Sequence, residues 1–300
     1  MASPELIEHA FRSMGTHVTV LLPADRRDGA GLARAQFEAW DARFSRFRSG
    51  SELSRLNAVA GTAVSVSQPM FAAATMAIDA ARATAGTFDP LLARRLVELG
   101  YDRTFDDLEP TRALPDPGEW SPGRWRDVEL DVGRRTIRLP AETGLDLGGL
   151  AKGMAVDAAL AELRRAGIPY AAVNAGGDLA VHGMPPGMRT WSIVVDGAGE
   201  RAVTILRGAL ATSTVLERRW RVGAETRHHL LEPRTGLPAA SGVVLATVAA
   251  STCAQAEVAA KVALLRGPEL GAAFLRGHGL AGLLVAEDGT TQRIAAQVAA

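Results

Sequence analysis

The hydrophobic positions along the chain change repeatedly between a spacing of two and a spacing of three or four. Residues 8–23 carry alternating and β-branched side chains on both sides of a turn at Met14, which predicts a strand hairpin. Helical spacing predicts a long helix over residues 31–47, a short helix capped by Ser51 and a third helix over residues 68–85. The first third of the chain therefore mixes strands and helices.

The rest of the chain continues this mixture. Residues 110–122 are rich in proline and acids, which predicts a loop or insertion rather than a core element. Helices are predicted from the central glycine-rich stretch to about Gly167 and over residues 253–265. The other apolar segments predict a hairpin over residues 125–139, strands within residues 170–181, 191–196, 202–206 and 243–249, and a closing hairpin over residues 279–294.

Composition narrows the class of protein. The 300 residues are 47% hydrophobic, which suits two domains or one large one. Equal numbers of basic and acidic residues, 33 each, leave no electrostatic signal for a nucleic-acid partner. The single cysteine, Cys253, excludes an internal disulfide and a cysteine-cluster metal site. No apolar run approaches the ~20 residues of a membrane span, and no secretory signal or lipobox cysteine is seen. We expect a cytoplasmic protein, although a chain trimmed of its leader would look the same.

The stretch LDLGGLAKGMAVD, residues 145–157, carries the main candidate chemistry. Asp146 follows an extended segment, and Gly148 and Gly149 tighten the chain before Lys152 opens a helical pattern. The unpaired N–H groups and dipole of a helix N-terminus favour an anion, and a lysine adds a full charge. The stretch predicts a phosphate site or, alternatively, a tight turn with a solvated lysine. It matches neither the Rossmann nor the P-loop pattern.

Three further segments each allow a binding and a plainly structural interpretation. Two glycines before Asp178 interrupt a strand pattern, as at a bulge or a close backbone approach. In the fixed turn of residues 87–90, Phe88 is either a ring for stacking or a hydrophobic plug. Glu257 and Lys261 stand four apart on a predicted helix, where the simplest expectation is a surface ion pair.

Taken together, these motifs resemble those of the FAD:protein FMN transferases, the ApbE family. The resemblance lies in the order and spacing of the whole series, and it covers nearly the whole chain. The matching pieces are MGT (14–16), FSRF…SELSRLN (44–57), GTFDP (86–90), DLGGLAKGMAVD (146–157), NAGGDL (174–179), ATS (211–213), HLLEPRTGLP (229–238) and AEVAAKVALLRG (256–267).

The resemblance implies an α+β fold, a single two-lobed unit over residues 1–300. Mixed or antiparallel sheets would be flanked by helices, with FAD between the lobes. It also implies a magnesium-dependent enzyme that transfers FMN from FAD to a threonine or serine hydroxyl of a target flavoprotein and releases AMP. Breaking a pyrophosphate requires charge neutralisation on the phosphoryl oxygens and an aligned hydroxyl nucleophile, which suits these residue types.

Position by position, the resemblance also assigns roles. His229 and Lys152 are the catalytic candidates, and neutral His229 would assist proton removal from the acceptor hydroxyl near pH 7. Gly149, through its backbone, and Glu257 would hold the metal. The residues implied to bind FAD are Met14, Phe47, Thr87, Phe88, Asp89, Asp146, Lys152 and Leu231.

Several positions depart from the family pattern. Glu232 and Glu257 replace aspartates and lengthen each arm by one methylene, and residues 214–217 differ from the stretch that usually follows ATS. Lys261 replaces a threonine of the metal site, and a protonated lysine has no acceptor for magnesium. We therefore expect weak magnesium binding that Lys261→Thr strengthens. Two alternatives stand beside the transferase: a non-catalytic FAD-binding protein, and an FAD pyrophosphatase that gives FMN and AMP.

Overall fold

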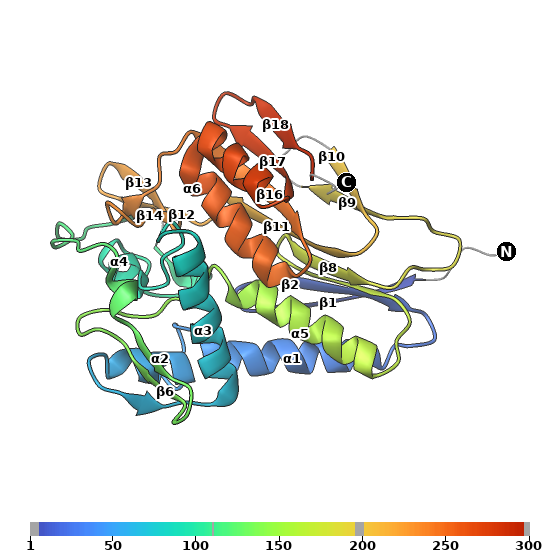
Figure 1. Ribbon diagram of the computed structural model, residues 1–300, viewed down its shortest axis with the longest axis horizontal. Helices are drawn as coiled ribbons and strands as arrows, with labels where there is room; N and C mark the ends of the chain where they lie inside the picture. The colour runs from blue at the N-terminus through green and yellow to red at the C-terminus, as the bar shows by residue number, and fades with distance from the viewer. Residues whose placement is uncertain (1–5, 110, 196–200, 297–300) are drawn as a thin grey trace. The chain divides into compact units, whose positions relative to one another are not determined.

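The computed structural model describes residues 6–109, 111–195 and 201–296 (Figure 1). Its mixture of helices and largely antiparallel strands confirms the predicted α+β class. The chain divides into two compact units that alternate along the sequence. Unit 1 comprises the described parts of Met1–Asp41, Leu150–Ser213 and Gly242–Ala300, and unit 2 comprises those of Ala42–Gly149 and Thr214–Ser241. The assignment of residues 1–300 to one domain stays a prediction.

Unit 1 is built on an eight-stranded sheet in the order β1-β2-β7-β8-β11-β16-β17-β18. The pairs β1/β2, β2/β7, β7/β8, β8/β11, β16/β17 and β17/β18 are antiparallel. The hairpins predicted over residues 8–23 and 279–294 are therefore confirmed. The strands are β1 (Leu6–Ser13), β2 (Thr16–Pro23), β7 (Ala171–Ala175), β8 (Asp178–His182), β11 (Gly208–Thr214), β16 (Val243–Ala250), β17 (Ala281–Ala286) and β18 (Thr291–Ile294).

Three helices accompany this sheet: α1 (Gly29–Phe44), α5 (Ala151–Arg165) and α6 (Cys253–Gly277). α5 packs on β7 and β8, α6 packs on β16 and β17, and the two helices touch each other (Figure 1). Alternate residues of a strand point to opposite faces. Accordingly, Val173 joins Phe37 of α1 in one core, while Ala172 joins Trp191 in another. Trp191 belongs to the hairpin of β9 (Trp191–Val195) and β10 (Arg201–Ile205). Asp196, the end of one predicted strand, lies outside the described residues.

Unit 2 combines short helices with small sheets. Its helices are α2 (Glu52–Ala58), α3 (Gln68–Ala83), α4 (Ala93–Glu98) and the 3-10 turns Phe105–Asp107 and Arg124–Asp127. Ser51 caps α2 as predicted, since its hydroxyl accepts the N–H of Ser54 at 2.9 Å. The sheets are β3-β6-β5, β13-β12-β4 and β14-β15, made of β3 (Val64–Ser65), β4 (Thr111–Arg112), β5 (Glu129–Asp131), β6 (Thr136–Arg138), β12 (Arg219–Val222), β13 (Glu225–His228), β14 (Leu231–Glu232) and β15 (Leu237–Pro238).

The structure departs from the predicted elements at β4, α4 and the end of α6. The loop prediction for residues 110–122 is wrong at β4, which pairs with the distant strand β12, although Pro110 lies outside the described residues. Helix α4 was not predicted, because six residues show little periodicity. Helix α6 continues to Gly277 beyond the predicted end, but Gly267 is non-helical there (φ 78°) and Pro268 follows it. A proline lacks the N–H for the helical ladder, so the helix breaks near its predicted end.

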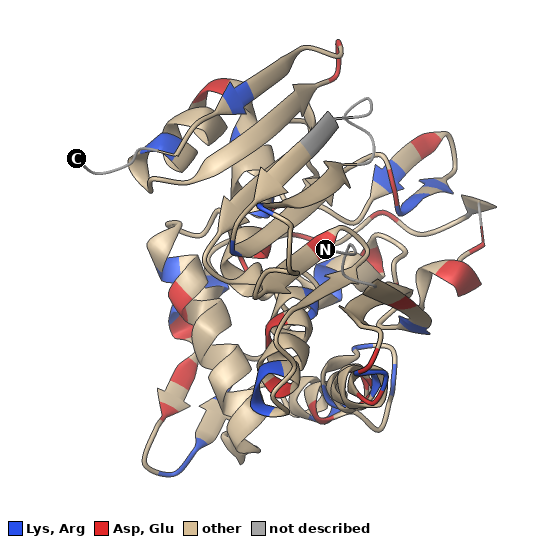
Figure 2. Ribbon diagram, turned by 90° about the vertical axis from the view of Figure 1, so that its right-hand side faces the viewer, with Lys and Arg blue, Asp and Glu red and all other residues tan. Residues whose placement is uncertain are grey.

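Basic and acidic positions are interspersed along the ribbon in Figure 2. This mixture is in keeping with the net charge of zero. None of the helices in the described ranges combines the length and the apolar character that crossing a membrane requires.

Candidate functional site

Lys152 is the centre of a cluster of charges in unit 1. It is the second residue of α5, and its Nζ lies 2.5 Å from Oδ2 of Asp178 and 2.7 Å from Oε1 of Glu257. Asp178 begins β8 and Glu257 lies on α6, so three distant segments meet at one ammonium group. The side chain of Lys152 is 17% exposed, against 1% for Asp178 and 5% for Glu257. The alternative of a solvated surface lysine is therefore wrong.

The second oxygen of Glu257 joins the two helices. Oε2 accepts the N–H of Gly153 at 2.9 Å, and this N–H is one of the first-turn donors that a helix leaves unpaired. Leu150, at the N-cap of α5, has no polar side chain for that task. In return, Asp157 of α5 accepts the N–H groups of Cys253 and Ala254 at the start of α6, at 2.8 and 3.0 Å. Each helix thus supplies an acid that caps the other.

Gly153 permits this arrangement. A Cβ built on Gly153 would lie 2.7 Å from backbone atoms of both Cys253 and Ala254, closer than real Cβ atoms come. A glycine at the start of a helix can serve the close approach of a ligand or of another part of the chain. At Gly153 the close partner is the first turn of α6. The helix crossing therefore accounts for this glycine without a ligand.

The cluster combines one ammonium with two carboxylates in a buried place. Burial raises the pKa of Asp178 to about 6, the Lys152 ammonium lowers it and the Glu257 charge raises it. Oδ1 of Asp178 is buried and has no hydrogen-bond partner among the described residues. Burial also raises the pKa of Asp157, against the two backbone N–H groups that it accepts. Negative charge thus exceeds positive charge around Lys152.

The resemblance implies a magnesium ion on Gly149 and Glu257. Magnesium requires oxygen ligands in close octahedral geometry, whereas a lysine ammonium offers only donors. Both oxygens of Glu257 already accept hydrogen bonds, from Lys152 and Gly153. Over the described ranges, no group of three or more His, Cys, Asp and Glu side chains is arranged to hold a metal. The residues around Glu257, as they stand, do not fit a magnesium ion.

Two residues assigned to FAD, Phe47 and Asp146, are joined in unit 2 by Arg46. The guanidinium Nε lies 3.1 Å from Oδ2 of Asp146, and the Arg46 and Asp146 side chains are only 11% and 12% exposed. The same guanidinium lies 4.2 Å from the ring centroid of Phe47 and 4.4 Å from that of Tyr101. Arg46 is not among the residues predicted for the site, although it stands beside Phe47 in the FSRF motif.

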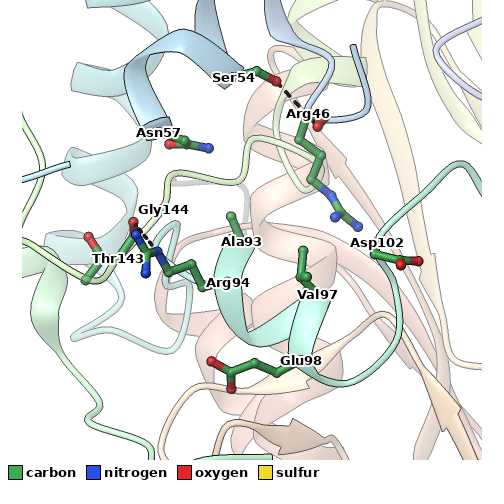
Figure 3. Close-up of a pocket in the computed structure, with 10 residues that line it drawn as sticks. All are labelled: Arg46, Ser54, Asn57, Ala93, Arg94, Val97, Glu98, Asp102, Thr143 and Gly144. Atoms are coloured by element: carbon green, nitrogen blue, oxygen red, sulfur yellow. Dashed lines mark hydrogen bonds between the residues drawn. The ribbon is translucent and has the colours of Figure 1, made fainter. Parts of the chain in front are cut away.

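Arg46 also lines a pocket of about 500 Å³ within unit 2 (Figure 3). Its Nη1 donates to the carbonyl of Tyr101 at 2.7 Å, and its Nη2 is buried without a hydrogen-bond partner among the described residues. The other lining residues are Ser54, Asn57, Ala93, Arg94, Val97, Glu98, Asp102, Thr143 and Gly144. The pocket therefore adjoins the Asp146–Arg46 pair, but the residues predicted for the site do not line it.

The turn of residues 87–90 is fixed by its own side chains. The N–H of Leu91 donates to Oδ1 of Asp89 at 2.8 Å, and burial raises the pKa of this carboxyl. Phe88 is only 2% exposed, and its N–H donates to the hydroxyl of Thr84 at 3.0 Å. The fixed turn is confirmed, and the burial of Phe88 favours the interpretation as a hydrophobic plug.

Met14 stands in a strained hairpin turn of unit 1. Both turn residues have positive φ, 51° at Met14 and 67° at Gly15, as a two-residue turn of type I′ requires. The turn between β7 and β8 lies beside it, because the N–H of Gly176 donates to the carbonyl of His17 at 3.1 Å. A Cβ on Gly176 would collide with the Thr16 hydroxyl. The predicted close approach of these glycines is thus an approach to the chain itself.

The paired histidines follow β13 in unit 2. His229 is half-buried in the bend after that strand, and Leu231 is buried at the start of β14. The ring Nε2 of His228 lies 3.1 Å from the carbonyl of Ala239, and burial lowers the pKa of this imidazole. Glu232 fastens the next turn by accepting the N–H of Arg234 at 3.1 Å. The longer acid at this position therefore still holds its turn.

Comparison with known proteins agrees with these motifs. A model of the ApbE family matches residues 14–284. The chain is similar to the FAD:protein FMN transferases of Treponema pallidum (29% identical over 257 residues, 76% of this chain and 68% of the relative) and Chlamydia trachomatis (30% over 229 residues, 75% and 71%). A relative of the same name from Rhodobacter capsulatus is 31% identical over 257 residues, which are 82% of this chain and 48% of that protein.

The fold is also found in solved structures. The crystal structure of the ApbE protein of Thermotoga maritima superposes with a TM-score of 0.84 at 25% identity, over 96% of this chain and 97% of that one. The apo form of the flavinyl transferase ApbE of Pseudomonas stutzeri gives a TM-score of 0.81 at 20% identity, over 99% of both chains. The second likeness concerns the fold alone.

Proposed function

The chain belongs to the ApbE family, and we propose that it transfers FMN from FAD to a threonine or serine hydroxyl of a target flavoprotein. The acceptor oxygen attacks the phosphorus of the FMN half, the bond from that phosphorus to the bridging oxygen breaks, and AMP leaves with this oxygen. The hydroxyl proton passes to a base. The observation that carries the proposal is the family match over residues 14–284.

The roles of individual residues are part of this proposal. His229 is the base that takes the proton of the acceptor hydroxyl. Phe47 and Leu231 offer apolar surface to the flavin nucleotide, and the turn of residues 87–90, Met14 and Asp146 add further contacts. The Asp146–Arg46 pair holds Phe47 in place, which supports a binding role for Phe47. Assistance by magnesium stays a prediction of the resemblance, and the donor set around Glu257 speaks against it.

The proposal is tested by incubating the protein with FAD and a flavoprotein domain that carries an acceptor threonine. We expect a fluorescent flavin band that migrates with the acceptor in a denaturing gel. A matched acceptor with Thr→Ala serves as the control and stays dark. Release of AMP, followed by chromatography, accompanies the transfer.

The same assay separates the two alternatives. An FAD pyrophosphatase would produce FMN and AMP without any acceptor and leave the acceptor dark. A non-catalytic FAD-binding protein would bind FAD and release neither product. His229→Ala is expected to retain FAD binding while losing the fluorescent band, and unchanged transfer by this variant would remove His229 from the proposal.

A further inference from the structure

Lys152 is surrounded by carboxylates in the way that a bound metal cation would be. Its ammonium is held between the carboxylates of Asp178 and Glu257, at 2.5 and 2.7 Å, and both acids are nearly inaccessible to solvent. Buried carboxylates are costly unless a positive charge or hydrogen bonds compensate them. The ammonium provides that compensation from within the chain.

We propose that Lys152 is the permanent cation of this site: its ammonium takes the place of a divalent ion between Asp178 and Glu257, so the unmodified protein does not bind a divalent ion there. Removal of the ammonium converts the two carboxylates into a divalent-cation site. Asp178 is thereby assigned a role as a cation ligand.

The scarcity of lysine in this chain supports a specific need for lysine at position 152. Of the 33 basic residues, only Lys152 and Lys261 are lysines, and the remaining 31 are arginines. An ammonium is a compact point charge, whereas a guanidinium is a wide planar fork. At this site both carboxylates contact one nitrogen atom, as a compact ammonium allows. A guanidinium would meet the two acids through separate nitrogens.

The Asp178 carboxylate has an oxygen that Lys152 does not use, which supports conversion into a divalent-cation site. Oδ1 is buried and receives no hydrogen bond of normal geometry among the described residues, although the backbone of Thr212 interacts with the carboxyl and lowers its pKa. With Lys152 shortened or neutralised, this oxygen and Oδ2 of Asp178 stand together with Oε1 of Glu257. Carboxylate oxygens are the ligands that hard divalent cations prefer. The Gly153 N–H continues to hold Oε2 of Glu257 and keeps that acid in position.

The experiment measures Mn²⁺ binding by electron paramagnetic resonance of the full chain, without FAD or acceptor. We expect no saturable Mn²⁺ binding by the unmodified protein and saturable binding by Lys152→Met. The affinity of Lys152→Met should exceed the upper limit for the unmodified protein by at least about a hundredfold. The reason is that a unit charge ~4 Å from a divalent ion repels it strongly even at an effective dielectric of ~20. Lys152→Met also unfolds at a higher temperature when Mn²⁺ is added. The double variant with Glu257→Gln loses the gain.

Two controls separate this site from other effects of charge. Lys261→Thr removes the only other lysine and is expected to leave Mn²⁺ binding unchanged, in contrast to the expectation from the family pattern. Lys152→Arg keeps the charge and gains no Mn²⁺ binding. A gain by Lys261→Thr equal to that of Lys152→Met would overturn the proposal, as would no gain by a folded Lys152→Met.

If Lys152→Met does not fold, Mn²⁺ binding by the unmodified protein still tests the proposal. Saturable Mn²⁺ binding that Glu257→Gln abolishes would show that the ammonium leaves room for a metal and would overturn the proposal. The consequence for catalysis, transfer that persists in excess EDTA, rests on the proposed transferase activity. If that activity is absent, transfer fails with and without metal, whereas the Mn²⁺ results stand unaffected.

Discussion

At the scale of single residues, Arg46 connects Asp146 and Phe47, two residues that the resemblance assigns to FAD. It binds the carboxylate of Asp146, stacks on Phe47 and Tyr101, and donates to the carbonyl of Tyr101. A guanidinium can do all of this because it is planar and offers donors along its edge while its face covers a ring. Arg46 is thus a positioning residue for two of the proposed FAD contacts.

We therefore expect Arg46→Ala to raise the FAD dissociation constant by at most roughly a hundredfold, because the lost Arg46–Asp146 contact is worth about 1.5–3 kcal/mol and acts on FAD only through the positions of Asp146 and Phe47. Calorimetry of FAD binding measures the change, and near-ultraviolet circular dichroism reports whether the rings of Phe47 and Tyr101 have moved. Arg46→Lys keeps the charge without the stacking and should recover part of the affinity. Full affinity in Arg46→Ala would show that Asp146 and Phe47 hold their places without it.

His228 makes stability depend on pH. Its folded-state pKa is lowered chiefly by burial, and its buried Nδ1 has no partner among the described residues. The folded protein therefore favours the neutral ring, so this contribution to stability is complete above the unfolded pKa of about 6.5 and is lost as the pH falls below it. We expect the free energy of unfolding to fall more steeply between pH 7 and pH 5 in the unmodified protein than in His228→Gln. Urea denaturation at each pH gives the free energy of unfolding. If it changed with pH equally in the two proteins, His228 would not be the source of the pH dependence.

At the scale of elements, the crossing of α5 and α6 sets the geometry of the charge cluster. Gly153 lets the helices approach, and Glu257 and Asp157 cap each other's helix. The atoms nearest to Gly153 belong to the backbone of Cys253 and Ala254. Backbone atoms cannot move away by a change of rotamer, as the end of a flexible side chain can. The helix crossing thus fixes the backbone at Glu257, and the hydrogen bonds from Lys152 and Gly153 hold its carboxylate.

Gly153→Ala tests this crossing. We expect a loss of stability of about 1–3 kcal/mol, the usual cost of overpacking, despite the better helix propensity of alanine. The matched control is Gly31→Ala on α1, where a Cβ meets nothing within 4 Å, and it should gain up to ~1 kcal/mol. Urea denaturation of both variants gives the comparison. If Gly153→Ala were as stable as Gly31→Ala, α5 and α6 would be able to move apart without a loss of folding free energy.

Elements with strong local patterns could be predicted from the sequence, and those made by distant pairing could not. The hairpin around Met14 and helices α1, α3 and α5 show clear periodicity. β4 is two residues long and exists through its pairing with β12. The same distinction holds for the site. Lys152 is conspicuous at its helix start, but its partners lie 26 and 105 residues away, and no spacing rule connects them.

At the scale of the whole molecule, neither unit is a continuous piece of chain. Unit 2 is made of two segments, and the second supplies β12 to β15. Trp220 of that second segment stacks on Tyr101 of the first, with ring centroids 5.3 Å apart, and its Nε1 donates to the carbonyl of Leu99 at 2.9 Å. The core of unit 2 therefore depends on two segments that are separated in the sequence by the unit 1 segment Leu150–Ser213.

We expect a fragment of residues 42–149 to lack fixed side-chain packing when it is produced alone. Joining residues 214–241 to it through a flexible linker should restore packing, because Trp220 and β12 are then available. Near-ultraviolet circular dichroism and the cooperativity of thermal unfolding distinguish the two fragments. Cooperative unfolding of the shorter fragment would contradict this account of the core.

The reciprocal caps of α5 and α6 also have a consequence for the order of events during synthesis. The contacts from Lys152, Gly153 and Asp157 to α6 span 105, 104 and 96 residues. A ribosome that adds about 5–20 residues each second leaves α5 exposed for several seconds before its partner emerges. Throughout that interval the first turn of α5 lacks its cap and Lys152 lacks Glu257. The nascent chain therefore reaches the last third of its length before this corner of the molecule can close.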